Sequence, residues 1–419
     1  MTTPILNLTS FDPALKVHYT DARVKIQSYE GSPALALLPK YTKFGGKFLP
    51  ITVQGATPRG RSAAFATAQA NKRASLYREF DITRVRDYAT ASIDNETFLA
   101  SKGDKNAMMQ AMVSEIDAAL QSVSNSLASA IYRSGSGAIG QVGASTVVAN
   151  TYLILSNPDD AVNFEVGDWL VAASTETGAL RTGGAARFRV GAIDRDTGRI
   201  DAVDAAGSPV ALNAAITAPI AVNDFLFIEG DAQAGGTPRK VAGFGAWLPA
   251  TVTSSLFFGV DRTIDATRFA GVRYDASGES ILEGLIGAAH RVRMQGGKPD
   301  TVFMNPVNVA DLCKALSSNV IYDSVKAKDA DISFEAIKVR TPSGVIKVVE
   351  DRFCPTDLAF MLQLDTWKLY SLGEAPQILQ QDGNMVLRDA TTDSAEVRVG
   401  YYAQLGCSAP GWNARIKLV

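Results

Sequence analysis

The chain contains 419 residues, more than a single compact core usually holds, which predicts two or three domains. Hydrophobic residues make up 46% and charged residues 20%, which excludes a disordered chain, and the formal net charge of −2 excludes a strongly basic protein built to grip nucleic acid. No apolar run reaches the ~18 residues of a membrane span and no signal-peptide order opens the chain, so we expect a cytoplasmic product with no membrane partner.

The first segment, residues 1–45, is predicted to be an N-terminal arm. Up to about residue 31 it mixes apolar and polar types without a sustained helical or strand period. This pattern is typical of a surface segment that becomes ordered on a partner, and it does not favour an independent domain.

A long β-hairpin is predicted next, within residues 46–100, which also begin the main fold of the chain. Apolar residues recur along 48–54, a second extended stretch covers 76–88, and a polar Gly- and Pro-containing region at 55–62 separates them. Charged residues lie on both faces of the strands: Lys47, Arg73, Arg78, Glu79, Asp81, Arg84, Arg86 and Asp87. We therefore expect the hairpin to lie outside the chain's own core and, because a two-stranded ribbon is marginal in water, to rest on a neighbouring molecule.

The strongest helical pattern covers residues 104–132, inside a spine-helix-and-linker segment at 101–145. Apolar residues repeat there at three- or four-residue spacing: Met108, Met112, Ile116, Leu120, Val123, Leu127 and Ile131. Residues 103 and 104 would cap the helix, and the Ser- and Gly-rich residues 134–137 would end it. At ~1.5 Å per residue the helix would span about 40 Å, the length of a domain.

Residues 146–232 are predicted to form an inserted, β-barrel-like domain. Short apolar runs at 152–155, 169–172, 187–193, 199–203 and 225–229 alternate with turn sequences, and the preceding residues 134–145 read as a flexible linker. Residues 233–277 would return the chain to the main fold. An interruption of this kind is a pattern that surface loops tolerate well.

The remainder of the chain mixes helices and strands. Helices are predicted at 278–294 and after Asn305-Pro306, and strands at 301–304, 344–349, 358–364, 367–372, 385–388, 396–405 and 415–418. We group residues 278–352 as one domain and residues 353–419 as its end together with the last strands of the main fold. The fold class is α+β, because the last strands return from far along the sequence.

No candidate for catalysis or cofactor binding survives scrutiny, and we expect no enzyme. His18 and His290 are the only histidines, and neither has a partner motif; no Gly-x-Ser-x-Gly elbow, phosphate loop or dinucleotide fingerprint occurs. The adjacent carboxylates Asp159 and Asp160 are interpreted as solvated surface residues whose pKa values stay ordinary.

Metal binding is not predicted either. Asp194, Asp196 and Asp201 superficially resemble a calcium loop, but Gly198 replaces the next ligand and no glutamate closes it, so a hairpin turn is favoured. The cysteines are three, far apart and in apolar settings, which favours buried thiols over a disulfide or zinc site: Cys313, Cys354 and Cys407.

The order of these elements resembles the Hong Kong 97 fold of tailed-phage major capsid proteins. A polar arm, a charged hairpin, one spine helix, the strand-Asn305-Pro306-helix unit and the closing strands at 397–402 and 415–418 follow that family's order. The hairpin then corresponds to the family's extended loop, and the β-domain to the insertions that some members carry.

The resemblance implies a virion protein, assembled in the host cytoplasm, that self-associates into hexamers and pentamers of an icosahedral shell. It implies portal and scaffolding partners and packaged double-stranded DNA that is bound without sequence specificity. The hairpin residues that we expect at contacts between subunits are Lys47, Phe48, Ile51, Val53, Arg78, Phe80, Ile82, Arg84 and Arg86.

Some members of the family join subunits by a lysine–asparagine isopeptide bond. Lysines for such a bond exist here, with one late asparagine: Lys40, Lys43, Lys47, Lys72 and Asn384. No glutamate base can be assigned from the sequence, so we expect noncovalent contacts. Two other interpretations stay open: an encapsulin-like nanocompartment shell, against which the inserted β-domain counts, and a β-rich hydrolase or binding module.

Overall fold

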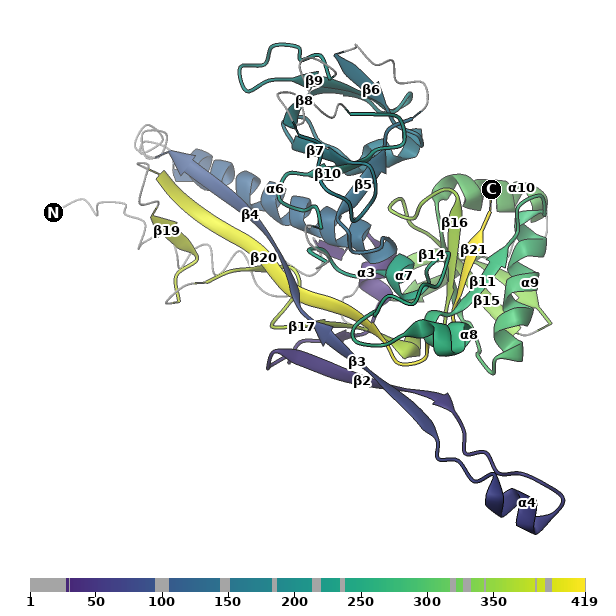
Figure 1. The fold of residues 1–419 in the computed structure, drawn as a ribbon. Helices are drawn as coiled ribbons and strands as arrows, with labels where there is room; N and C mark the ends of the chain where they lie inside the picture. Colours follow the sequence, from purple (N-terminus) through teal and green to yellow (C-terminus); the bar gives the residue numbers. More distant parts are fainter. Residues whose placement is uncertain are drawn as a thin grey trace.

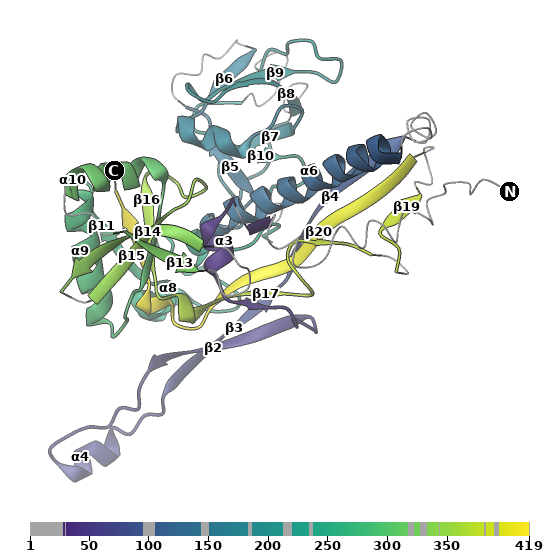
Figure 2. The ribbon, with the colours of Figure 1, turned by 180° about the vertical axis from the view of Figure 1, so that it is seen from behind.

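Figure 1 shows the chain as a computed structural model. The structure describes residues 28–29, 31–94, 105–143, 151–182, 187–212, 220–233, 238–316, 322–326, 333–342, 344–380, 383–388 and 394–418. An elongated body carries a long helix and long strands, and a compact α/β domain lies at one end of it. A β-module and a long hairpin project from the body on opposite sides, in both Figure 1 and Figure 2.

The predicted spine helix is α6, Lys105–Tyr132. Its described apolar stripe is buried: Ile116, Leu120, Val123, Leu127 and Ile131. Shortly after the helix ends, Gly135 takes a φ of +84°, a left-handed conformation that glycine adopts without strain. The expected cap at residues 103 and 104 and the side chains of Met108 and Met112 lie outside the described part of the chain.

The spine helix packs on a six-stranded sheet whose centre is the long strand β20, Ser394–Cys407. Its antiparallel partner is β4, Val85–Asp94, with Tyr402 opposite Arg86. The other strands of this sheet are β1 Lys40–Tyr41, β17 Trp367–Ser371, β18 Gln377–Ile378 and β19 Val386–Arg388. Residues 85–88, expected in the hairpin, therefore belong to the body.

The α/β domain (residues 266–362 and 414–417) contains a seven-stranded sheet in the order β11-β21-β16-β12-β15-β14-β13. Its strands are β11 Val272–Asp275, β12 Thr301–Met304, β13 Tyr322–Lys326, β14 Ser333–Thr341, β15 Gly344–Glu350, β16 Leu358–Leu362 and β21 Ala414–Lys417. The helices are α8 Ala266–Ala270, α9 Ile281–Met294 and α10 Pro306–Leu316. A capping box starts α9, in which the Ser280 hydroxyl accepts from the Glu283 backbone and the Glu283 carboxylate accepts from the Ser280 backbone.

The inserted module (residues 138–232) is a six-stranded antiparallel sheet in the order β5-β10-β7-β8-β9-β6. Its strands are β5 Ala138–Gln141, β6 Tyr152–Ile154, β7 Trp169–Ala173, β8 Arg187–Asp194, β9 Arg199–Val203 and β10 Phe225–Ile228. A bridge between Val142 and Leu155 joins the two edges, so the sheet closes around a core that includes Phe164 and Phe188. Five of these strands lie at the predicted positions, whereas β5 occupies part of the expected flexible linker.

The projecting hairpin consists of β2, Phe48–Ala56, and β3, Leu76–Thr83, with a short helix α4, Phe65–Ala70, at its far end. The two strands pair in antiparallel register, with Ile51 opposite Phe80. Two further short helices lie in the body: α3 Pro33–Leu37 and α7 Phe244–Trp247.

Candidate assembly surfaces and the junction of the inserted module

The base of the hairpin is buried in this chain, which corrects part of the expected contact set. The side chains of Ile51, Val53, Phe80 and Ile82 are all less than 9% exposed and belong to the main core. Phe80 lies 5.1 Å, ring centroid to centroid, from Trp247. Strand alternation explains the difference, because the apolar residues of both strands share one face while the charges face water. Within this chain these four side chains are covered by its own core.

The remaining expected contact residues differ in exposure. Lys47, Phe48, Arg78 and Arg86 are exposed, Phe48 by 52%. Arg84 is half-buried and fixed inside the chain, where its guanidinium donates to the carbonyl oxygens of Phe44 and Gly46 and lies over the Phe44 ring. Arg84 therefore fixes the segment that follows β3 to residues 44–46, just before β2.

Two exposed apolar side chains of the hairpin were not among the predicted contacts. Phe65, on α4, is 81% exposed, and Tyr77 is 55% exposed. Their signal in the sequence was weak, because an isolated aromatic residue among alanines and threonines forms no periodic stripe. An apolar ring this exposed at the end of a projection is a feature of interaction surfaces.

Much of the described part of the predicted N-terminal arm is buried in the core, although Tyr41 and Lys43 near its end are exposed. Tyr29, Leu35 and Phe44 are at most 1% exposed, and the Tyr29 hydroxyl donates to the carbonyl of Ala375 at 3.0 Å. Residues 1–27 of the arm lie outside the described part of the chain, as does residue 30. The short helix α3 escaped prediction because a single turn cannot show a helical period.

Asp351 anchors this N-terminal segment to the α/β domain. Its carboxylate, 1% exposed, accepts from the Ala34 backbone N–H at 3.2 Å and from the Ser32 hydroxyl at 3.4 Å, and also from the Phe353 N–H at 3.0 Å. Burial raises the pKa of Asp351 to about 6, although the hydrogen bonds that it accepts oppose the rise. This single carboxylate therefore links residues 32–34 to the α/β domain, more than 300 residues further along the chain.

The two linkers of the inserted module run side by side where they meet the spine helix. The backbone N–H of Gly243 donates to the Arg133 carbonyl at 3.1 Å, and that of Gln233 donates to the Ser136 carbonyl at 2.9 Å. A Cβ added at Gly243 would lie 2.1 Å from the Ile131 carbonyl oxygen, so this position requires glycine. Direct backbone pairing makes the attachment close rather than loose.

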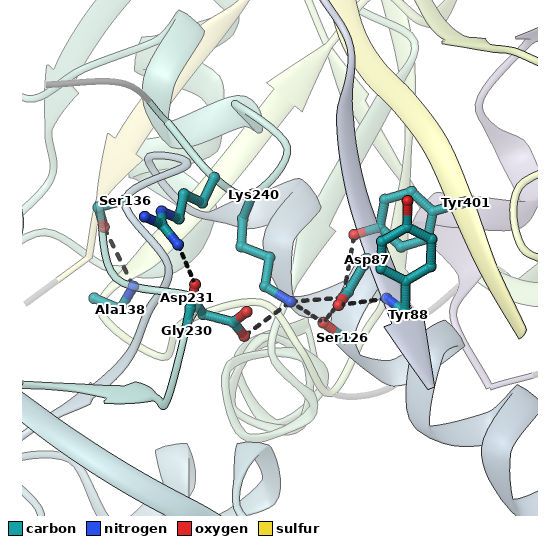
Figure 3. A network of polar contacts seen from close by, with 10 residues as sticks. Asp87, Tyr88, Ser126, Ser136, Ala138, Gly230, Asp231, Lys240 and Tyr401 are labelled. Atoms are coloured by element: carbon teal, nitrogen blue, oxygen red, sulfur yellow. Dashed lines mark hydrogen bonds and ion pairs between the residues drawn. The ribbon is translucent and has the colours of Figure 1, made fainter. Parts of the chain in front are cut away.

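A buried cluster of charges fastens the same junction, as Figure 3 shows. The Lys240 ammonium lies 2.6 Å from the Asp87 carboxylate and 2.9 Å from that of Asp231, and it donates to the Ser126 hydroxyl at 3.1 Å. Ser126 and Tyr401 each donate to Asp87 as well, at 2.6 and 3.5 Å. The cluster joins β4, α6, β20 and the returning linker of the module.

The pKa values at this junction follow from burial and from the charges. Burial raises the pKa of Asp231, although Lys240 opposes the rise. Burial by itself would lower the pKa of Lys240, but Asp87 and Asp231 outweigh it, so the pKa is raised. One cation between two carboxylates leaves the cluster with a formal charge of −1, so it depends on Lys240 staying in place.

Two further contacts hold the module, and one corrects an expectation. Asp160 is not a free surface carboxylate: it pairs with Arg133 at the end of α6 at 2.8 Å, and its side chain is only 19% exposed. Burial raises its pKa, against the effect of Arg133. The Asn157 amide donates to the Thr356 hydroxyl of the α/β domain at 2.9 Å. The module is thus fixed to both other parts of the chain.

His290 and Asp194, which were considered for catalysis and metal binding, lie on the surface, Asp194 in a hydrogen-bonded turn. His290 is exposed on α9, whereas His18 lies outside the described residues. Asp194 accepts from the Thr197 hydroxyl and the Asp196 N–H within the β8–β9 turn, and these bonds lower its pKa. Within the described ranges no three His, Cys, Asp or Glu side chains are placed to hold a metal ion. No helix of that same part is long and apolar enough to span a membrane.

Comparisons with known proteins fit this architecture. Residues 223–399 match the family model described as SU10 major capsid protein. The capsid asymmetric unit of cyanophage A-1(L) is similar over 92% of this chain and 92% of its own, at 12% identity and a TM-score of 0.51.

Two other solved structures are less similar. The capsid of a native GTA particle has 8% identity over 91% of this chain and 88% of its own, with a TM-score of 0.45. A structure of Mycobacterium phage Ogopogo has 8% identity over 92% and 91%, with a TM-score of 0.41. No curated protein sequence matches the chain significantly.

The similarity to the cyanophage capsid establishes the fold over almost the whole chain, and the family match covers the return of the module, the α/β domain and most of the last strands. The chain is a phage major capsid protein of the Hong Kong 97 fold, a structural protein.

Proposed function

We propose that copies of this chain assemble into hexamers and pentamers that close an icosahedral shell around double-stranded DNA. The observation that carries the proposal is the hairpin, whose far half has no support from its own chain. Residues 57–75 project away from the body, and every side chain of α4 is at least partly exposed, including Phe65 at 81%. A projection that buries nothing of its own is stabilised when another copy covers it.

The contacts between copies would use the exposed residues of the hairpin. From the expected set these are Lys47, Phe48 and Arg78, with exposed Arg86 next to the hairpin on β4 of the body, and we add Phe65 to the proposed set because of its exposure. A contact in which different surfaces of two copies meet produces rings when the rotation closes, which is how hexamers and pentamers form. Each subunit is then held on several sides, so individually modest contacts give a stable shell.

The near-neutral charge supports a role as a DNA container that does not hold its contents by specific contacts. A formal charge of −2 over 419 residues offers little counterion release on binding to DNA. Portal and scaffolding proteins are the further partners that we propose, because a closed shell needs an entrance for the DNA and control of its curvature.

Truncation of the hairpin tests this function directly. Residues 57–75 are replaced by Asn-Gly, a two-residue turn that closes a hairpin. In sedimentation-velocity runs we expect particles from the wild-type chain and only small species from the truncated chain. The two chains should have the same melting temperature. Val345→Ser, a control at another exposed apolar site, should leave assembly intact. Particle formation by the truncated chain would refute the role of the hairpin. Nuclease-resistant DNA inside the particles would distinguish a genome container from a shell that encloses a cargo enzyme.

A further inference from the structure

The charges of this chain are separated between its two projections. The far half of the hairpin, residues 57–75, contains Arg59, Arg61, Lys72 and Arg73 and no acidic residue, a formal charge of +4. The inserted module, counted over residues 151–232, contains twelve acidic and five basic side chains, a formal charge of −7. The net charge of −2 therefore conceals a dipole between two parts on opposite sides of the body (Figures 1 and 2).

The basic charges of the hairpin are uncompensated within the chain. All four basic side chains are exposed, or nearly so, and in the described structure none of them has an acidic side chain within ion-pair distance. Arg59 and Arg73 lie directly opposite one another in a β-bridge, joined by an N–H···O bond of 2.8 Å. Like charges in directly opposed positions destabilise a strand pair, so an anionic partner would stabilise this one.

The module has acidic side chains to offer. Four of its carboxylates pair with its own arginines and two more with Arg133 and Lys240. Six others have no basic side chain within ion-pair distance among the described residues: Asp159, Asp168, Glu176, Asp194, Asp196 and Asp204. The module's negative charge is therefore largely unpaired.

A cleft of about 660 Å³ at the base of the module combines this charge with a concave shape. It lies between the module, the end of α6 and the α/β domain, and its charged lining residues are Arg133, Asp159, Asp160, Glu176, Asp357 and Arg415. Four carboxylates and two arginines give the lining a formal net charge of −2. Arg133 is already paired with Asp160. Its volume falls within the range of about 300–1,000 Å³ that binding clefts usually have.

We propose that the basic end of the hairpin of one copy docks on the acidic inserted module of a neighbouring copy, with the cleft at the module's base as the acceptor. This inference rests on the proposed shell function and names the surface that receives the hairpin. Within one copy the two parts lie on opposite sides of the body, so only a second copy can bring them together. The contact is heterologous, and its electrostatic attraction guides copies into one relative orientation.

Charge reversal tests the pairing. Reversing the hairpin (R59E, R61E, K72E and R73E together) should lower particle yield about tenfold or more in 0.1 M salt, and so should reversing the acceptor (D159K and D357K together). Both acceptor residues are exposed, so the fold should tolerate the change. A chain with both reversals should regain particles, because every copy then supplies two complementary surfaces again. E335K with E350K, two exposed carboxylates of the α/β domain outside the lining of the cleft, is the matched control and should assemble normally.

Each outcome decides the inference. The inference is overturned if either reversed chain assembles normally. It is also overturned if the combined variant does not recover assembly while both single variants keep the wild-type melting temperature. A loss of nucleic acid from otherwise normal particles on hairpin reversal would make nucleic acid the partner, and would likewise overturn it. If the wild-type chain forms no particles at any salt concentration, the proposed shell function itself fails.

Discussion

Replacement of Lys240 by methionine should destabilise the attachment of the inserted module by about 2–4 kcal/mol. Removing one partner of a buried ion pair typically costs ~3–5 kcal/mol, because the other charge stays buried and unpaired. Here two carboxylates are left facing each other, but Asp87 and Asp231 remain 15% and 21% exposed, so water reduces the loss somewhat. Methionine keeps the length and apolar stem of lysine, so the effect reports charge rather than packing.

The assay is urea unfolding of the unassembled chain, followed by tryptophan fluorescence, with hydrogen exchange locating the loss. Lys314→Met is the control, since that lysine is 77% exposed in a surface pair and should cost at most about 0.5 kcal/mol. Adding Asp231→Asn to Lys240→Met should recover about 1–2 kcal/mol. The deficit should also shrink as pH falls towards 5, because burial raises the pKa of Asp231 and a protonated carboxyl no longer repels Asp87. A loss no larger than that of the control would refute the reasoning.

Three further changes have defined outcomes. The pKa of Asp351 is about 6 in the folded chain, against an ordinary value of 3.8, so its protonation stabilises the fold fully below pH 3.8 and this stabilisation is lost as pH rises through 6. When pH falls from 7 to 4, the free energy of unfolding of the wild type should therefore rise by about 2–3 kcal/mol relative to that of Asp351→Asn. Gly243→Ala places a methyl group against carbonyl oxygens of α6 and should lower the melting temperature by several degrees, whereas Gly45→Ala meets open space and should change nothing. Phe80→Ala should cost about 3–5 kcal/mol in denaturant unfolding, whereas Phe65→Ser should leave stability within about 0.5 kcal/mol and reduce assembly.

Elements with a long or regular pattern could be predicted from the sequence. The stripe of the spine helix and the buried strand Thr301–Met304 lie where their periods place them, because their own side chains supply the burial. Turn residues delimit the strands of the module equally well, as for β9, Arg199–Val203.

Features that depend on contacts between distant segments could not be predicted. The charges along the hairpin strands favoured an exposed hairpin. The contact of Phe80 with Trp247 could not be predicted, because Trp247 lies far along the sequence. Asp160 was interpreted as an ordinary surface residue, and no pattern singled out Lys240, because their partners Arg133, Asp87 and Asp231 reach them only through the fold. β5 was missed because its partner, β10, follows only after most of the module.

Cryo-electron microscopy of the purified recombinant chain, at rising protein concentration, tests most directly whether other copies complete this molecule. We predict closed shells of uniform diameter with fivefold and sixfold clusters, in which each hairpin lies on an adjacent subunit. A monodisperse single molecule at the highest concentration, with residues 57–75 packed against its own body, would contradict this.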